Sequence, residues 1–203
     1  GFGSHRIEGI GDKHVPWIHN VKNTDLVIAI DDNAVVNIAR LFNEAEGQRY
    51  LQEKGVPKTF ISKLSYLGFS GIANLAMAIK MAKYYELGKH DILLTVLTDS
   101  MDLYQSRLQE MREELGDFTY TDAAVVFAQN LQGLTTDAMQ ELSYSDRRRV
   151  HNLKYFTWVE QQGKTYEEIV DQWGERNYWR ELQSQIPEID ALITAFNRKV
   201  GLL

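Results

Sequence analysis

The spacing of apolar residues along this chain changes near residue 100. Before that point, two short runs rich in Leu, Ile and Val, at residues 26–30 and 91–99, predict strands. The second run is almost continuously apolar, which is typical of a strand buried on both faces of a parallel sheet. Between the runs, apolar residues three and four apart predict helices at about 31–47, 58–66 and 72–87. This order of elements predicts an α/β fold with a parallel sheet.

The helix expected after the first strand has the clearest pattern. Asp31, Asp32 or Asn33 can accept hydrogen bonds from its first N–H groups. Gly47 is expected to end it. Four apolar residues recur at helical spacing and are expected to face the core: Val35, Ile38, Ala39 and Phe42.

After residue 100 the sequence predicts no strand. Helical periodicity continues and predicts helices at about 103–115, 121–131, 145–162, 166–173 and 187–200. The chain is therefore expected to have two parts. These are an α/β part over residues 1–108 and an all-helical extension over residues 109–203.

Composition excludes several classes of protein. The chain has 44% hydrophobic residues and a formal net charge of −6, and its apolar runs are too short to cross a bilayer. No signal peptide is expected, and the absence of cysteine fits a reducing cytoplasm. One basic cluster, at residues 146–154, is expected to be a solvated helix surface. We therefore expect no nucleic-acid or membrane partner.

Two short polar motifs are candidates for ligand binding. The turn from Gly68 to Gly71 contains Ser70 and opens a helix, where N–H groups and a hydroxyl can meet a ligand. Its spacing is not that of a serine-hydrolase motif. Asp99 and Ser100 follow the second predicted strand, at the sheet edge where α/β proteins bind ligands. Either residue could also cap the next helix.

Two segments near the beginning of the chain also contain residues that could meet a ligand. Gly9, Ile10 and Gly11 form a flexible loop that could approach a ligand, or simply a tight turn. His14 and His19 are five residues apart and have no clear third ligand. We therefore expect no metal site.

Taken together, three segments resemble fold-type II pyridoxal-phosphate enzymes, the family of cysteine synthase, cystathionine beta-synthase and threonine synthase. "HRIEGIG" at residues 5–11 is similar to the family's His-Lys-Ile-Gln-Gly-Ile-Gly segment, and "NEAEG" at 43–47 resembles its Glu-Glu-Gly. "VLTDSMDLYQSRL" at 96–108 is similar to the segment of cystathionine beta-synthase that contains Asp-Ser. The resemblance covers about residues 3–108 and implies the C-terminal half of the family's α/β domain.

The resemblance also implies roles for individual residues. Ser70, in the turn with Gly68 and Gly71, would face the pyridine nitrogen of pyridoxal phosphate, and Asp99 and Ser100 would lie behind it. The loop of Gly9, Ile10 and Gly11 would border the substrate. A serine at the ring nitrogen suits β-elimination and β-replacement on amino acids. The implied protein is thus a cytoplasmic lyase or transferase of amino-acid metabolism.

The family's cofactor-binding lysine and glycine-rich phosphate loop have no counterpart in this sequence. The resemblance therefore implies a fragment, which is inactive alone and is completed by an N-terminal half in the same or a separate polypeptide. It also implies a small amino-acid substrate and a homo-oligomer. Two alternatives remain open: a non-catalytic binding module, and a helical interaction module whose second half is the functional part.

Overall fold

The computed structural model describes residues 5–7, 9–11 and 13–203 and is mostly helical, with 61% of these described residues in helices. Its one sheet in the described residues pairs β1 (Leu26–Ile28) with β2 (Met139–Glu141). The Ala29 N–H donates to the Ala138 carbonyl at 2.9 Å and the Leu142 N–H to the Asp25 carbonyl at 2.8 Å. This pairing is antiparallel. The predicted α/β fold with a parallel sheet is therefore wrong for this chain.

The two predicted strands had different outcomes. The run at 26–30 is confirmed in part, as β1. The run at 91–99 forms neither a strand nor a helix, and the side chains of Ile92 and Leu94 are 86% and 89% exposed. The prediction of no strand after residue 100 is also wrong, because β2 lies there. High β-propensity makes a segment suitable for a sheet, but it forms a strand only where a neighbour pairs with it.

The chain forms two compact units, and each of them contains two stretches of sequence. Unit 1 contains residues 1–13 and 27–140, and unit 2 contains residues 14–26 and 141–203. The chain passes from one unit to the other three times, after Lys13 and, inside the strand pair, after Leu26 and after Gln140. The boundary at residue 108, expected between the first part of the chain and a helical extension over residues 109–203, stays a prediction.

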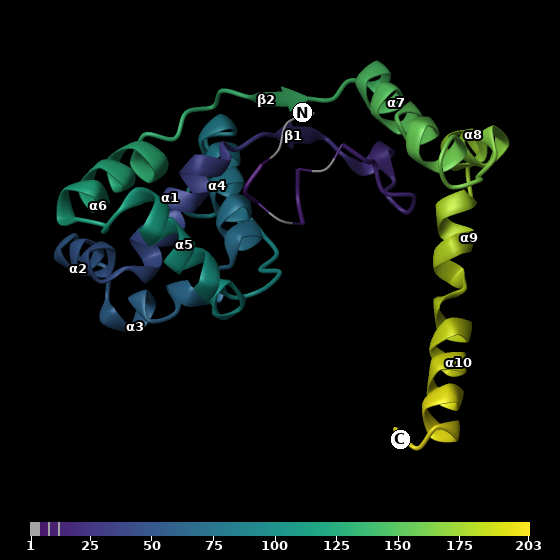
Figure 1. The fold of residues 1–203 in the computed structure, drawn as a ribbon. Helices are drawn as coiled ribbons and strands as arrows, with labels where there is room; N and C mark the ends of the chain where they lie inside the picture. Colours follow the sequence, from purple (N-terminus) through teal and green to yellow (C-terminus); the bar gives the residue numbers. More distant parts are fainter. Residues whose placement is uncertain (1–4, 8, 12) are drawn as a thin grey trace. The chain divides into compact units, whose positions relative to one another are not determined.

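Unit 1 is a helical bundle built around α1 (Asp32–Asn43), as Figure 1 shows. Helix α1 packs against α2, α4 and α6. The four residues predicted to face the core (Val35, Ile38, Ala39 and Phe42) are all buried, which confirms the helical periodicity. The other helices of the unit are α2 (Ala45–Glu53), α3 (Lys58–Ile61), α4 (Phe69–Tyr84), α5 (Gln105–Leu115) and α6 (Tyr120–Val126), which a π-helical turn (Phe127–Gln132) follows.

Both ends of α1 are fixed by side chains. Asp31 accepts a hydrogen bond from the Ala34 N–H at 3.0 Å and so caps the helix, as the sequence predicts for one of three residues. At the other end, the buried Arg40 binds Glu44 at 3.2 Å, and Arg112 of α5 binds the same carboxylate at 2.9 Å. Arg40 also donates to the Gly116 carbonyl at 2.6 Å. This network holds the end of α5 against α1.

Unit 2 has four α-helices among the described residues: α7 (Tyr144–Asn152), α8 (Tyr166–Gly174), α9 (Tyr178–Ser184) and α10 (Ile186–Lys199). Ser143 with Asp146, and Thr165 with Glu168, form capping boxes at the starts of α7 and α8. Helices α9 and α10 follow one another with a single residue between them (Figure 1). Over the described part of the chain, every helix is too short or too polar to cross a membrane.

Lys154 lies at the centre of unit 2, with none of its surface exposed. Its ammonium group donates to the Trp17 and His19 carbonyl oxygens, both at 2.8 Å, and to Gln172 Oε1 at 2.7 Å. The rings of Trp17 and Trp179 lie 6.0 and 5.4 Å from the Nζ atom. This one side chain therefore joins residues 14–26 to the helices of the second stretch.

The charge of Lys154 makes the stability of unit 2 depend on pH. Burial lowers the pKa of Lys154 from 10.5 to about 8. Below pH 8 the lysine is protonated in both the folded and the unfolded chain, so stability does not change through this group. As the pH rises from 8 to 10.5, the folded state loses its proton first, so the unfolded state binds more protons and stability rises.

We expect the free energy of unfolding of unit 2 to increase by up to about 3 kcal/mol across this pH range. Chemical denaturation followed by circular dichroism at several pH values measures it. The Lys154→Met variant is the control and should lose the increase. A wild-type stability that falls steadily between pH 8 and 10.5 would contradict the prediction.

Candidate functional site

The turn before α4 lies against Asp99. The Gly68 N–H donates to the Asp99 carbonyl at 3.0 Å. A Cβ atom at Gly68 would lie only 2.1 Å from Asp99 Oδ1, so only glycine allows this approach. The other oxygen of the carboxylate, Oδ2, accepts a hydrogen bond from the Tyr104 hydroxyl at 2.5 Å. The turn at residues 68–71 and the segment that begins at Asp99 are thus neighbours.

The third motif lies beside the same turn. Ser70 is in the first turn of α4 and is 5% exposed. Gly9 has a left-handed backbone (φ +88°), and a Cβ atom there would lie 3.8 Å from the Ser70 hydroxyl oxygen. Gly11 is also left-handed, at φ +81°, and lies against His5. Ile10 is partly buried against the core of the unit. The loop therefore needs its glycines and lies next to Ser70.

Two of the expected site residues have other roles. Ser100 caps the short 3₁₀ helix Met101–Tyr104 and bonds with Asp102, at 3.3 Å from its N–H and 3.1 Å from its carboxylate. Of the two residues that could cap this helix, Asp99 and Ser100, it is Ser100 that does so. A Cβ atom at Gly71 would make ordinary contacts with Leu67 and Leu97, and it would not approach Asp99.

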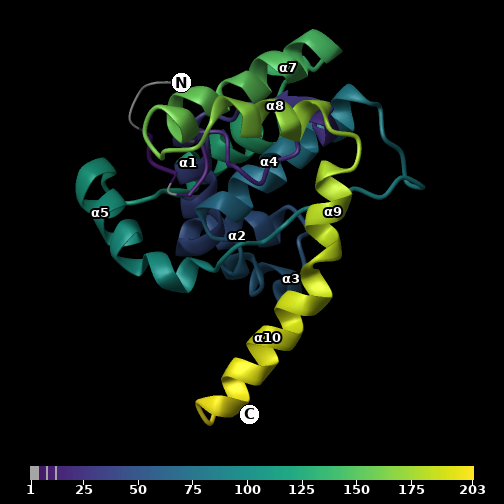
Figure 2. The same ribbon diagram turned by 90° about the vertical axis from the view of Figure 1, so that its right-hand side faces the viewer.

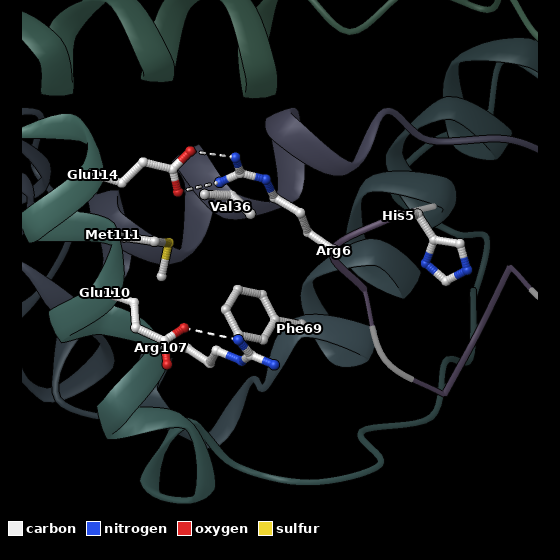
Figure 3. Close-up of a pocket in the computed structure, with 8 residues that line it drawn as sticks. All are labelled: His5, Arg6, Val36, Phe69, Arg107, Glu110, Met111 and Glu114. Atoms are coloured by element: carbon white, nitrogen blue, oxygen red, sulfur yellow. Dashed lines mark hydrogen bonds and ion pairs between the residues drawn. The ribbon is translucent and has the colours of Figure 1, made fainter. Parts of the chain in front are cut away.

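A pocket of about 320 Å³ adjoins this turn, with Phe69 in its wall. Arg6 binds Glu114 through two hydrogen bonds, at 2.6 and 3.2 Å, and Arg107 binds Glu110 at 2.8 Å. Figure 3 shows Phe69 and Met111 lying between these two ion pairs. His5 and Val36 complete the lining. The pocket therefore combines an apolar wall with two guanidinium and two carboxylate groups.

The ion pair of Arg6 stabilises its charged form. The hydrogen bond and charge of Glu114 raise the pKa of the Arg6 guanidinium. The Arg6 backbone N–H also donates to Asp32 at 2.7 Å, which fixes the segment at the start of α1. Each guanidinium group of this pocket is thus already paired with a carboxylate of the same pocket. The described residues include no group of three or more His, Asp or Glu side chains that could hold a metal ion.

Sequence reasoning missed several residues of this site. Tyr104 holds Asp99 from five residues away, and its ring packs on that of Phe69 with centroids 5.1 Å apart. Arg107 and Glu110 follow on α5, and Arg6 lies beside the glycine loop. The only available signal was their position inside or next to the quoted motifs, because which side chains share a pocket depends on the fold.

Comparisons of the chain with protein-family models, with curated proteins and with solved structures found no match. The resemblance to fold-type II pyridoxal-phosphate enzymes is therefore corrected. No family model supports it, and the helical fold with one antiparallel strand pair is not the parallel-sheet half-domain that it implied.

Proposed function

We propose that unit 1 forms one wall of an enzyme site for amino-acid chemistry that uses pyridoxal phosphate. The enzyme would be a lyase or transferase acting by β-elimination or β-replacement, with its cofactor-binding lysine in another polypeptide segment. One observation carries the proposal. Three short motifs lie together around the turn at residues 68–71, although they are up to about ninety residues apart in the sequence. They are the glycine loop at 9–11, the turn itself and the segment at 99–100.

The residues present fit one part of this cofactor. The Ser70 hydroxyl is buried and already interacts within the chain, so it would donate to a pyridine nitrogen in exchange for that contact. We assign no site to the phosphate group of the cofactor. This group needs available donors, and Arg6 and Arg107 are each bound to a glutamate. We therefore assign only the ring-nitrogen side to this chain. When bound, the cofactor supplies the electron sink for reactions at the α and β carbons of an amino acid.

The chain's own residues would bind and orient the ligands. Tyr104 holds the Asp99 carboxylate, and Asp99 in turn supports the backbone at Gly68, so the turn that carries Ser70 is fixed. The neighbouring pocket offers Phe69 as an apolar surface to a side chain of the substrate. Its guanidinium and carboxylate groups are paired with one another, so we assign them no ligand group.

Equilibrium dialysis of pyridoxal phosphate against the 203-residue chain tests the assignment of Ser70. We expect reversible binding, and Ser70→Ala should weaken it by about two- to tenfold, because one hydrogen bond contributes roughly 0.5–1.5 kcal/mol. Ser62→Ala is the matched control. Its exposed hydroxyl donates to the Thr59 carbonyl at 3.3 Å and does not line the pocket, so its loss should leave the affinity unchanged.

Two results would contradict the proposal. Equal affinity of the wild type and Ser70→Ala would remove the assigned contact. Borohydride reduction in the presence of the cofactor, followed by mass spectrometry, would contradict the external lysine if it gave one stoichiometric adduct on one lysine of this chain.

A further inference from the structure

The most exposed apolar segment of unit 1 is the stretch at 91–99. Figure 2 shows α4 continuing into a long irregular stretch before α5 begins. Ile92, Leu94, Val96 and Leu97 are all exposed there, the first two almost completely. Isolated apolar residues on a surface are ordinary, but a contiguous run of this kind marks an interaction site or an aggregation hazard.

The backbone of this segment is also largely without protein partners. Within the described part of the chain, no N–H group of residues 92–98 donates a hydrogen bond to another residue. The Val96 carbonyl accepts one from the Asn74 side chain at 2.8 Å, and the Gly68 N–H binds the Asp99 carbonyl at the far end. The segment is thus held at a few points and offers most of its N–H groups to a partner.

We propose that residues 92–98 become a β-strand by pairing with strands of a different polypeptide, while Asp99 keeps its hydrogen bonds to Gly68 and Tyr104. The sequence is that of an interior strand, since apolar residues occupy both alternating sets of positions. Such a strand needs neighbours on both edges and cover on both faces. The strands in the described part of this chain, β1 and β2, are three residues long and pair with each other.

The charges at the ends of the segment argue against a second copy of this chain as the partner. Asp91 and Asp99 flank the apolar run. In an antiparallel in-register pair of two copies, Asp91 of one copy would lie opposite Asp99 of the other. In a parallel pair, each aspartate would lie beside the same aspartate of the other copy. Like charges directly opposite are destabilising. The complementary partner is an apolar strand with lysine or arginine at its ends.

Hydrogen exchange of the whole chain with mass spectrometry tests this inference without any cofactor, so its result is independent of the proposed function. The probe is a short peptide with Val, Ile and Thr in its centre and lysine at both ends. In the free chain, the amides of residues 92–98 should exchange as in an unfolded peptide. One peptide pairs with one edge of the segment, to which alternate N–H groups point. It should therefore slow the exchange of about every second amide of residues 92–98 by about tenfold or more.

Two controls separate strand pairing from other binding. The same peptide with N-methylated central amides should not protect the segment, and a version with glutamate ends should protect it less. Leu94→Asp should abolish protection without changing the melting temperature, because this side chain is almost fully exposed. Ile18→Asp, at another residue that is 76% exposed, should keep the protection.

Three outcomes would overturn the inference. Slow exchange of residues 92–98 in the free chain would mean that the chain already pairs this segment, with itself or with a second copy. Equal protection by the N-methylated peptide would mean that backbone pairing is not involved. No protection by the lysine-flanked peptide would mean that the segment does not accept a strand.

Discussion

Replacing Gly47 by alanine is expected to destabilise unit 1 by about 3 kcal/mol, at the upper end of the usual cost of overpacking a core. Gly47 lies in the first turn of α2, where the chain folds back on the end of α1. A Cβ atom at this position would lie 2.2 Å from the Leu41 carbonyl oxygen and 2.7 Å from two other backbone atoms of Leu41. A flexible side chain could move away, but these are backbone atoms of a buried helix.

Gly174→Ala is the control for this variant. Gly174 is also helical, at the end of α8, and nothing lies within 4 Å of the position that its Cβ would take. Alanine there should change stability by no more than about 1 kcal/mol, in the stabilising direction, because alanine favours the helix over glycine. Calorimetry and circular dichroism measure both variants. Equal melting curves for Gly47→Ala and the wild type would show that α1 and α2 do not approach so closely.

Replacing Lys154 by alanine should have a comparable effect on unit 2, with a loss of about 3 kcal/mol or more. The substitution removes a long, fully buried side chain and leaves a cavity. It also leaves three acceptors without their donor: the Trp17 and His19 carbonyl oxygens and Gln172 Oε1. Buried acceptors that lose their partner are costly. Because the lysine joins two distant stretches of sequence, the unit should unfold rather than adjust locally.

Lys164→Ala is the matched control. Lys164 also lies over Trp17, at 5.0 Å from the ring, but it is half exposed and pairs with Glu168 at 3.0 Å on the surface. Its loss should change the free energy of unfolding by less than about 1 kcal/mol. Lys154→Met separates the two causes, since methionine fills the space but donates nothing. If both alanine variants unfold alike in calorimetry, the central role of Lys154 is refuted.

Local sequence patterns predicted most of the helices. The residues expected to face the core from the first helix, at positions 35, 38, 39 and 42, are buried. The helices expected at 166–173 and 187–200 correspond to α8 and α10. Two short helices, α2 and α9, were missed. Gly47 was expected to end the first helix, but α1 ends at Asn43 and the glycine serves the close approach of α2. The sequence alone does not distinguish a glycine that allows close packing of two helices from a glycine that ends a helix.

Local sequence patterns could not predict which residues distant in the sequence pair with each other. The run at 91–99 has the composition of a strand, but a strand also needs a partner, and composition does not name one. The grouping of Ser70, Asp99 and the glycine loop was expected at the edge of a parallel sheet. The structure brings these residues together for a different reason, because a backbone hydrogen bond joins Gly68 to Asp99. Tyr104, which fixes the carboxylate, was not recognised for the same reason.

The aromatic residues around Lys154 have a consequence for spectroscopy. All four tryptophans of the chain (Trp17, Trp158, Trp173 and Trp179) belong to unit 2, whereas unit 1 has tyrosines and no tryptophan. Light absorbed selectively by indole therefore excites unit 2 alone, and the emission reports the packing of that unit. The chain thus carries a natural fluorescent label on one unit, and its unfolding can be followed separately from that of the unit that holds the candidate site.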